Sequence, residues 1–364
     1  MTSISFYLSE GSRILKNSRH AKRYGFHRYP GNAKQICHKI IKNCWNGTFF
    51  QASTTNFPQF WTRDFGLCAE SLIKLGYTKE VEQTVRYALT QFQKHGKITT
   101  TISSKGKPFD VFSYAIDSLA WLLHSITLLN EPFKEFHPLI EKEVRRLCTI
   151  AVDINTGLVN NKKYSSIKDF AIRQSSCYDN CMLAVISASL KKLKLSNPLN
   201  IFNYEKIIFE HFWNGNYFYD DSTKKLYVAS DANLFPFYFG IIKEKSILKK
   251  AFQSIHDAQL DEPFPLAYTT KAAPVTFISQ EFLMKNYERD STWLHIGPLY
   301  LKLLQNIDKK QAQEYIDRYT KMIEHFGTFP EVLFSNGKPF QSFFYHSDQG
   351  MLWAANYLTL VENR

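Results

Sequence analysis

The sequence predicts an all-α protein built as an (α/α)6 barrel, a toroid of six helical hairpins with long loops and short β-hairpins at one end. Three observations support this prediction. Apolar residues recur with the 3.6-residue period of helices along nearly the whole chain and rarely alternate. The helical segments come in pairs joined by short turns, as antiparallel neighbours require. Long loops separate the pairs, and no Pro- or Ser-rich linker divides the chain.

The periodic segments define the helices in chain order. In 79–94, for example, Val81, Val85 and Leu89 share one face, as in a helix that packs on a core. The turn Leu75-Gly76-Tyr77 joins this segment to the one before it. We expect twelve helices, at 32–45, 65–76, 79–94, 112–129, 136–152, 177–194, 203–213, 234–242, 244–256, 293–306, 308–325 and 345–361.

The connections between the pairs are long, polar and rich in aromatic residues. They cover 46–64, 95–111, 153–176, 257–292 and 326–344, and short strands are expected at 217–219 and 225–228. Loops of this length inside a compact domain usually carry function. We therefore expect the active site at the end of the barrel where these loops gather.

Composition and charge narrow the class of protein. The chain has 364 residues, 44% of them hydrophobic and 21% charged, which excludes a disordered or collagen-like protein. The net charge is +12, and basic residues are dense near the N-terminus. Residues 1–30 are expected to form a basic arm, solvated or loosely attached, or alternatively a targeting or phosphate-contacting arm. Residues 31–364 are expected to form a single catalytic domain.

Several partners and compartments are disfavoured by what the sequence lacks. No apolar run reaches the roughly 18 residues that a membrane helix needs, and the N-terminal segment does not resemble a secretory signal. The six cysteines form no CxxC pair and no zinc-site spacing. No nucleic-acid-binding signature accompanies the lysines. We expect a cytoplasmic protein with no cofactor, no metal, and no membrane or nucleic-acid partner, and the oligomeric state stays open.

The segment Phe60–Phe65 closes the first long loop and opens a helix. An aspartate accepts hydrogen bonds from sugar hydroxyls, an arginine donates a fork of them, and a tryptophan packs on the apolar face of a sugar ring. Trp61, Arg63 and Asp64 therefore suit sugar binding. The alternative is that Asp64 caps the helix next to an unrelated arginine.

Two further carboxylates lie in apolar surroundings. Asp117 stands near the start of a strongly apolar helix, and Glu331 lies in the loop segment Phe329-Pro330-Glu331-Val332. Burial raises the pKa of a carboxyl, as a general acid needs, and an idle buried charge is costly. The structural alternatives are a helix cap for Asp117 and an ordinary surface residue for Glu331.

The order of these segments resembles that of the (α/α)6-barrel, or six-hairpin, glycoside hydrolases. The pattern is Trp-x-Arg-Asp-Phe, then Asp-Ser-x-x-Trp, then Phe-Pro-Glu, then Gln-x-x-x-Trp-x-Ala, and 175–182, 230–237 and 290–297 fall in register between them. The most similar groups are the neutral/alkaline invertases, followed by amylo-α-1,6-glucosidase (debranching-enzyme) and glucoamylase-like catalytic domains. The resemblance covers about residues 45 to 360.

The resemblance implies an inverting hydrolase of a short α-glucoside or a related glycoside. Asp117 would be the general acid and Glu331 the general base, and Arg63 with Asp64 would bind the sugar at the cleavage point. Inversion requires carboxyl groups about 6.5–9.5 Å apart, because a water molecule must fit between the base and the sugar. The substrate partner would be an oligosaccharide or small glycoside.

Weaker candidates complete the expected site. Trp61, Trp121, Tyr178 and Trp293 are candidates for stacking on sugar rings, although Trp121 equally suits the barrel core. Other candidates for binding hydroxyls, or for capping helices, are Asp179, Asp231, Lys168, Asp169, His295, Gln341 and Gln349.

Two departures from the invertase pattern separate this chain from sucrose hydrolases. Phe329-Pro330-Glu331-Val332-Leu333 replaces Trp-Pro-Glu-Tyr-Tyr, and the Gly-Gly-x-Trp segment is missing. Two other functions stay open at this stage: a non-catalytic carbohydrate-binding pseudoenzyme on the same barrel, and a nucleic-acid-associated protein that uses the basic arm.

Overall fold

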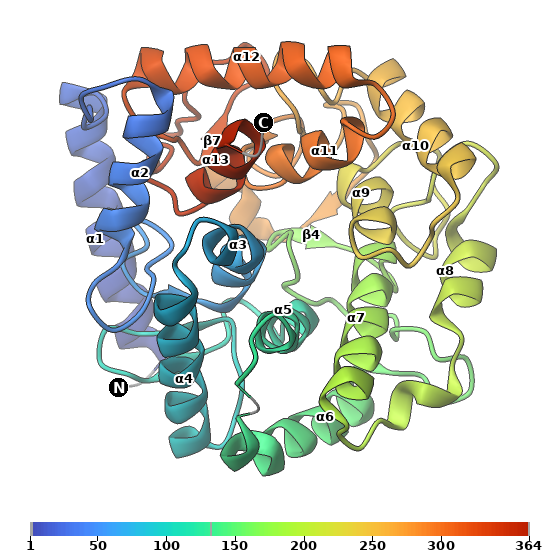
Figure 1. Ribbon diagram of the computed structural model, residues 1–364. Helices are drawn as coiled ribbons and strands as arrows, with labels where there is room; N and C mark the ends of the chain where they lie inside the picture. Colours follow the sequence, from blue (N-terminus) through green and yellow to red (C-terminus); the bar gives the residue numbers. More distant parts are fainter. Residues whose placement is uncertain (1–2, 132, 363–364) are drawn as a thin grey trace.

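Six helices form a closed inner ring. The computed structural model describes residues 3–131 and 133–362. Each inner helix packs on the next one along the chain, and the last packs on the first, so that the ring closes (Figure 1). Its members are α3 (Thr62–Lys74), α5 (Ile116–Thr127), α7 (Cys177–Leu193), α9 (Ser230–Tyr238), α11 (Gly297–Leu304) and α13 (Ala354–Glu362).

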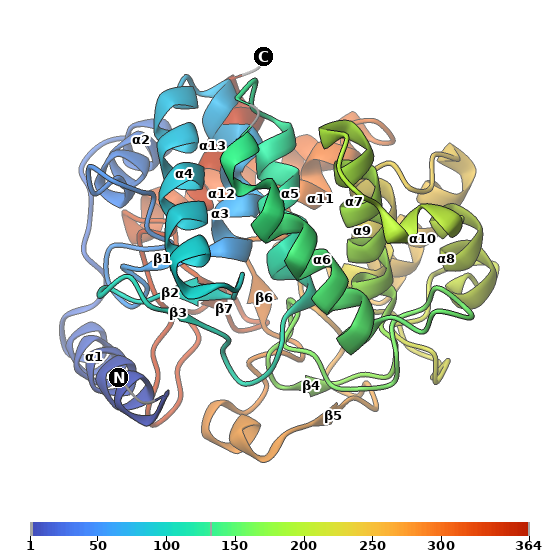
Figure 2. The same cartoon turned by 90° about the horizontal axis from the view of Figure 1, so that it is seen from below.

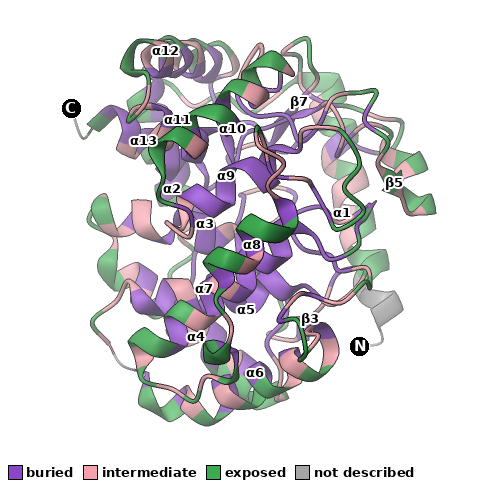
Figure 3. Cartoon of the chain, turned by 90° about the vertical axis from the view of Figure 1, so that its right-hand side faces the viewer, coloured by how far each residue is buried: buried purple, intermediate pink, exposed green. Residues whose placement is uncertain are grey.

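An outer ring of helices encloses the first. Each outer helix contacts an inner one, which completes the six expected hairpins. These helices are α2 (Ala33–Cys44), α4 (Thr78–His95), α6 (His137–Ala151), α8 (Tyr204–Phe212), α10 (Lys245–Asp257) and α12 (Lys309–Phe326). Burial differs between the rings as their sequences predict: the inner helices are buried almost all round, whereas the outer helices expose one face (Figure 3). The predicted all-α barrel is confirmed.

The long loops gather at one end of the barrel and carry all the strands of the described residues (Figure 2). One antiparallel sheet has the order β1 (Phe60–Trp61), β2 (Thr101–Ile102), β3 (Pro108–Phe109). Two antiparallel pairs join distant loops, β4 (Ala171–Ile172) with β5 (Thr276–Phe277) and β6 (Thr292–Trp293) with β7 (Val332–Leu333). Short 3-10 helices are η1 (Lys134–Phe136), η2 (Pro198–Ile201) and η3 (Ser279–Met284). The expected strands at 217–219 and 225–228 are wrong, since Phe218 makes only an isolated bridge to Trp213.

The last predicted helix begins nine residues later than its apolar pattern indicates. Residues 345–353 stay extended because their backbone N–H groups bond to distant partners instead of to a helical turn. Asp348 donates to the Glu331 carboxylate, Met351 to the carbonyl of Phe329 and Leu352 to the carbonyl of Ala52. This extended segment brings the loops of both ends of the sequence together beside Glu331.

The expected loosely attached N-terminal arm is instead helix α1 (Ser3–Tyr24), which lies along the loop end of the barrel (Figures 1 and 2). Buried Ser18 accepts a hydrogen bond from the backbone N–H of His346 at 3.0 Å. Two basic residues of this helix, which were expected to face solvent, contact the loops instead. Arg13 donates a hydrogen bond to the carbonyl of Asn56 at 2.7 Å, and Lys22 donates one to the carbonyl of Phe343 at 3.0 Å. The charges of this segment are therefore partly used in holding α1 in place.

The described residues include neither a disulfide nor a metal-ligand cluster. All six cysteines there are unpaired thiols, and the described His, Cys, Asp and Glu residues form no cluster of three suited to a metal ion. Among the described helices, none combines the length and the apolar character needed to cross a bilayer.

Candidate active site

The N-terminal ends of the inner helices face the long loops. The first turns of α3, α5, α7 and α9 each carry an acidic residue, namely Asp64, Asp117, Asp179 and Asp231. The partial positive charge at a helix N-terminus favours a carboxylate there. The barrel thus concentrates acidic side chains at the same end as the loops.

A small pocket of about 90 Å³ opens among these elements. It is lined by aromatic and charged side chains from α3, from the loop before α7 and from the strands β6 and β7 with their flanking loops. The lining residues are Phe57, Trp61, Arg63, Asp64, Leu67, Ile167, Asp169, Tyr287, Glu288, Trp293, His295, Glu331, Met351 and Trp353. Mostly aromatic walls with a few convergent polar groups are typical of a small-molecule site.

Glu331 is a buried carboxylate of the pocket with hydrogen bonds to both of its oxygens. It is 2% exposed, and one oxygen accepts a hydrogen bond from the Tyr287 hydroxyl at 2.5 Å. The other accepts from the Tyr345 hydroxyl and from the backbone N–H of Asp348 at 2.9 Å. Burial, reinforced by the nearby Asp348 carboxylate, raises the pKa of Glu331 to about 7. A carboxylate with such a pKa can accept a proton near neutral pH, as a general base must.

Asp117 lies behind the pocket wall. Its side chain is fully buried, and Oδ2 accepts hydrogen bonds from the backbone N–H of Ile167 at 2.9 Å and from the Tyr178 hydroxyl at 3.1 Å. Oδ1 has no hydrogen-bond partner. Burial raises the pKa of Asp117 to about 6, against the opposing effect of the Arg63 guanidinium. The protonation state suits a general acid, but the carboxyl is absent from the pocket lining.

Arg63 connects Asp117 to a carboxylate that does line the pocket. Its guanidinium lies 3.4 Å from Asp117 and 3.5 Å from Asp169. The Asp169 side chain is 26% exposed, which leaves it accessible from the pocket. Glu288 fixes the backbone here, because its carboxylate accepts from the N–H groups of Asp169 at 2.6 Å and Phe170 at 2.8 Å. Asp169 thus has the access that Asp117 lacks.

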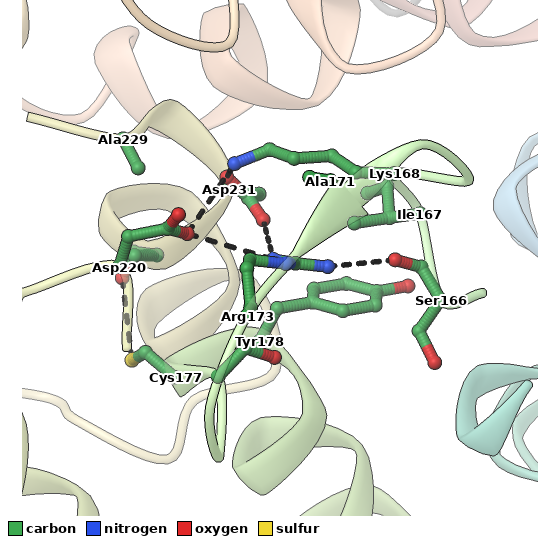
Figure 4. A network of polar contacts seen from close by, with 12 residues as sticks. Ser166, Ile167, Lys168, Ala171, Arg173, Cys177, Tyr178, Asp220, Ala229 and Asp231 are labelled. Atoms are coloured by element: carbon green, nitrogen blue, oxygen red, sulfur yellow. Dashed lines mark hydrogen bonds and ion pairs between the residues drawn. The ribbon is translucent and has the colours of Figure 1, made fainter. Parts of the chain in front are cut away.

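A buried ion-pair network holds the other side of the same loop (Figure 4). Lys168 lies 2.7 Å from Asp231 and 3.3 Å from Asp220, and Arg173 lies 2.8 Å from Asp231. Arg173 also donates to the carbonyl of Ser166 at 2.8 Å. All four charged side chains are at most 4% exposed, so the network is fully desolvated. It anchors residues 166–173 on α9 and fixes where Asp169 enters the pocket.

The structure brings six of the predicted binding residues to the pocket and leaves seven outside it. Trp61, Arg63, Asp64, Asp169, Trp293 and His295 line it. Burial lowers the pKa of His295, so its ring is neutral and can exchange hydrogen bonds with hydroxyl groups.

Five of the seven predicted residues outside the pocket have the following structural partners. Trp121 is a core side chain whose indole N–H donates to the Tyr178 hydroxyl at 3.1 Å, and Tyr178 in turn bonds to Asp117. Asp179 accepts from the Ser176 hydroxyl at 2.7 Å, and Asp231 belongs to the ion-pair network. Gln349 accepts from the backbone N–H of His27 at 2.6 Å. Neither Lys168 nor Gln341 lines the pocket.

Sequence reasoning missed Tyr287, Glu288, Tyr345 and Trp353 as site residues. The signal for Tyr287 and Glu288 was available: an aromatic-acidic pair in the long loop 257–292, shortly before Trp293. Tyr345 escaped notice because the apolar pattern placed it inside a helix. Trp353 is the tryptophan of the Gln-x-x-x-Trp-x-Ala motif, but its position in that motif predicted no role for it.

The chain has the six-hairpin (α/α)6-barrel fold, with a carboxylate-rich aromatic pocket at the loop end of its barrel. Solved structures with this architecture include several glycosidases. A protein described as "Glycosidase Wild Type" is 11% identical, with 97% of each chain covered and a TM-score of 0.66. A family 63 mannosylglycerate hydrolase from Thermus thermophilus, in complex with Tris and D-glycerate, is 12% identical over 90% of this chain and 100% of that one, with a TM-score of 0.61.

A rhamnosidase from Klebsiella oxytoca with rhamnose bound is also similar in fold. It is 10% identical, with 93% of this chain covered and a TM-score of 0.61, and the match spans 66% of the rhamnosidase chain. No protein-family model matches the sequence, and no curated protein matches it significantly. At these low identities, the structural matches show a shared fold and nothing beyond it.

Proposed function

We propose that the protein is an inverting glycoside hydrolase that cleaves a short α-glucoside or a related small glycoside, with Glu331 as general base. The observation that carries the proposal is the Glu331 carboxylate, buried between two tyrosine hydroxyls in a pocket walled by tryptophans and by Arg63. Tryptophan faces suit the apolar face of a sugar ring, and Arg63, Asp64 and His295 suit its hydroxyls. The glycosidase structures of the same fold support the reaction class.

In the proposed reaction Glu331 takes a proton from a water molecule, whose oxygen attacks the anomeric carbon. The bond from that carbon to the glycosidic oxygen breaks, and a general acid on the opposite face of the ring protonates the departing oxygen. Both carboxyl groups return to their starting states when they exchange protons with solvent. The product sugar carries the inverted configuration.

For the general acid, the family resemblance and the geometry of the pocket favour different residues. The resemblance implies Asp117, whose pKa is raised but whose carboxyl is covered. The pocket favours Asp169, because only a group that reaches the substrate can protonate the glycosidic oxygen. We propose Asp169 as the acid and Asp117 as a positioning residue that orients Arg63. The assignment of Asp117 as the acid is the alternative.

Leaving-group dependence separates the two assignments. An acidic leaving group needs no protonation, so a variant that lacks the general acid keeps turnover of such glycosides and loses turnover of alkyl glycosides or disaccharides. We expect this selective loss in Asp169→Asn and a loss on both substrate types in Asp117→Asn. The reverse pattern would restore Asp117 as the acid.

The reaction class itself is tested by screening disaccharides and glycosyl-glycerates and following the released anomer by NMR. A β-anomer from an α-linked substrate supports inversion, and a retained anomer refutes it. Saccharide binding with no release of reducing sugar from any substrate would favour the carbohydrate-binding pseudoenzyme.

A further inference from the structure

A second cavity, of about 440 Å³, adjoins the catalytic pocket. The two share Phe57, Trp61, Asp169 and Tyr287 in their walls, so they lie side by side around these four residues. The shared side chains include the proposed acid and a tyrosine that bonds to the proposed base. A glycosidic bond positioned for cleavage would therefore lie at the junction, with its sugar in the small pocket and its leaving group in the larger cavity.

The walls of this second cavity are predominantly apolar. Beyond the shared residues, much of the apolar lining comes from α1, from the segment before α5 and from η3, including Ile14, Leu15, Val111, Phe112, Leu283 and Met284. Several of these remain open to solvent, with Phe112 44% and Leu283 47% exposed. Contiguous exposed apolar surface on a folded protein usually marks a binding site.

The cavity-lining atoms without a hydrogen-bond partner, Trp61 Nε1 and Asp169 Oδ1, belong to residues shared with the catalytic pocket, whereas polar groups farther out already have partners within the protein. Glu10 pairs with Arg13 and accepts from the Gln59 side chain. The Tyr7 hydroxyl accepts from the backbone N–H of Phe112 at 3.1 Å, and the Tyr345 hydroxyl donates to Glu331. A second sugar placed here would bury hydroxyls with few groups left to bond to them, at a cost of about 1–3 kcal/mol for each unsatisfied group.

Helix α1 is fixed as one wall of this cavity. It is tied to the loops at both ends of the described sequence, through Arg13 to Asn56 and through Ser18 to His346. The opposite wall comes from η3 and the segment around Phe112. The cavity thus depends on α1 lying against the loop end of the barrel, and its lining suits an apolar group.

We propose that this cavity binds an apolar aglycone, an aryl or alkyl group, so that the substrate is a glycoside of a hydrophobic alcohol or phenol rather than an oligosaccharide. The proposal rests on the proposed glycosidase function and names the class of leaving group. The sugar specificity stays with Trp61, Arg63 and Trp293 in the catalytic pocket.

A homologous series of alkyl glycosides tests the proposal. With the sugar that the wild type hydrolyses, KM for the methyl, butyl and octyl glycosides should fall by up to about fourfold per added methylene, since each buried methylene is worth about 0.8 kcal/mol. The same series titrated into the Glu331→Gln variant by calorimetry measures binding without turnover. A flat series, with the methyl glycoside still hydrolysed, would overturn the aglycone proposal and leave the glycosidase function intact.

Variants of the apolar wall provide the matched control. Leu15→Asp and Leu283→Asp should abolish the chain-length dependence and leave kcat/KM for the methyl glycoside unchanged. Leu8→Asp is the control, because Leu8 lies on the same helix as Leu15, is 70% exposed and does not line the cavity. Equal effects of the three variants on the chain-length dependence would overturn the proposal. It would also be overturned if the wild type is a dimer and Leu283→Asp dissociates that dimer without changing the KM values of the alkyl series. If no glycoside is hydrolysed but octyl glycosides still bind more tightly than methyl glycosides, the hydrolase proposal fails and the cavity assignment stands.

Discussion

Replacing Glu331 with glutamine should abolish hydrolysis and at the same time stabilise the protein at alkaline pH. Glu331 is 2% exposed, and its pKa is about 7 in place of the ordinary 4.5. Below about pH 4.5 the carboxyl is protonated in the folded and unfolded states alike, so it costs nothing. Between these values the unfolded state releases the proton more readily, and the folded state loses stability as pH rises.

The size of the effect follows from the same pKa. A rise from 4.5 to about 7 corresponds to roughly 3 kcal/mol above pH 7. With an unfolding entropy of about 2.1 cal/mol/K per residue, this amounts to a difference in Tm of roughly 4 °C for a chain of 364 residues. Glutamine keeps the volume, and its amide oxygen can still accept from Tyr345 and from the N–H of Asp348. Its amide nitrogen can donate to the Tyr287 hydroxyl oxygen, and the Tyr287 proton can turn to the neighbouring Tyr345 hydroxyl.

The assay is differential scanning calorimetry of wild type and Glu331→Gln at pH 4.5 and pH 8.5. The Tm of the variant should exceed that of the wild type at pH 8.5, and the gap should narrow at pH 4.5. Glu205→Gln, at an exposed position of α8, controls for a general effect of removing one negative charge. A variant less stable than wild type at pH 8.5, or a gap that does not change with pH, would refute the argument that Glu331 is held at a desolvation cost.

Three further predictions concern the base, the buried network and the barrel core. Because Glu331 must be ionised to accept a proton, kcat/KM should fall tenfold per pH unit well below pH 7, and a rate profile without an acidic limb near its pKa of about 7 would argue against it. Lys168→Met should destabilise the protein by about 3–5 kcal/mol in urea titrations, since it leaves Asp231 buried without its closest cation. The exposed Lys206→Met is its control, with an expected loss below about 1 kcal/mol. Gly297→Ala should fail to give soluble protein or should lower Tm sharply, because the added Cβ would overlap a tyrosine hydroxyl and a backbone carbonyl oxygen.

The helices were predictable because each makes its own periodic signal. The apolar face of α4, with Val81, Val85 and Leu89, is visible in the sequence without knowledge of its neighbours. The start of α13 was not predictable, because residues 345–353 are kept out of the helix by bonds to the loops near Ala52 and Phe329, which only the folded structure reveals. Helix α1 was hidden for a related reason: its basic residues resemble a solvated arm until the carbonyls that they contact are known.

The candidate site was predictable in part. Arg63, Asp64, Trp293 and Glu331 stand in local motifs, and the structure brings them to one pocket. The difference in access between Asp117 and Asp169 depends on which side of Arg63 each carboxylate lies. That relation is set by the packing of two segments about 50 residues apart, which no local pattern records.

The closure of the inner ring has a consequence for biosynthesis. The Asp348 carboxylate accepts from the hydroxyls of Ser53 and Thr55, and the segment that carries it leads directly into α13, which packs on α2 and α3. Ser53 and Asp348 are roughly 300 residues apart in the sequence. A ribosome therefore synthesises the first long before the second, although both belong to the surroundings of Glu331. Glu331 acquires its surroundings only after the final hairpin has been synthesised and has docked, so catalytic competence should arrive late and all at once, and a nascent chain should carry no partial activity.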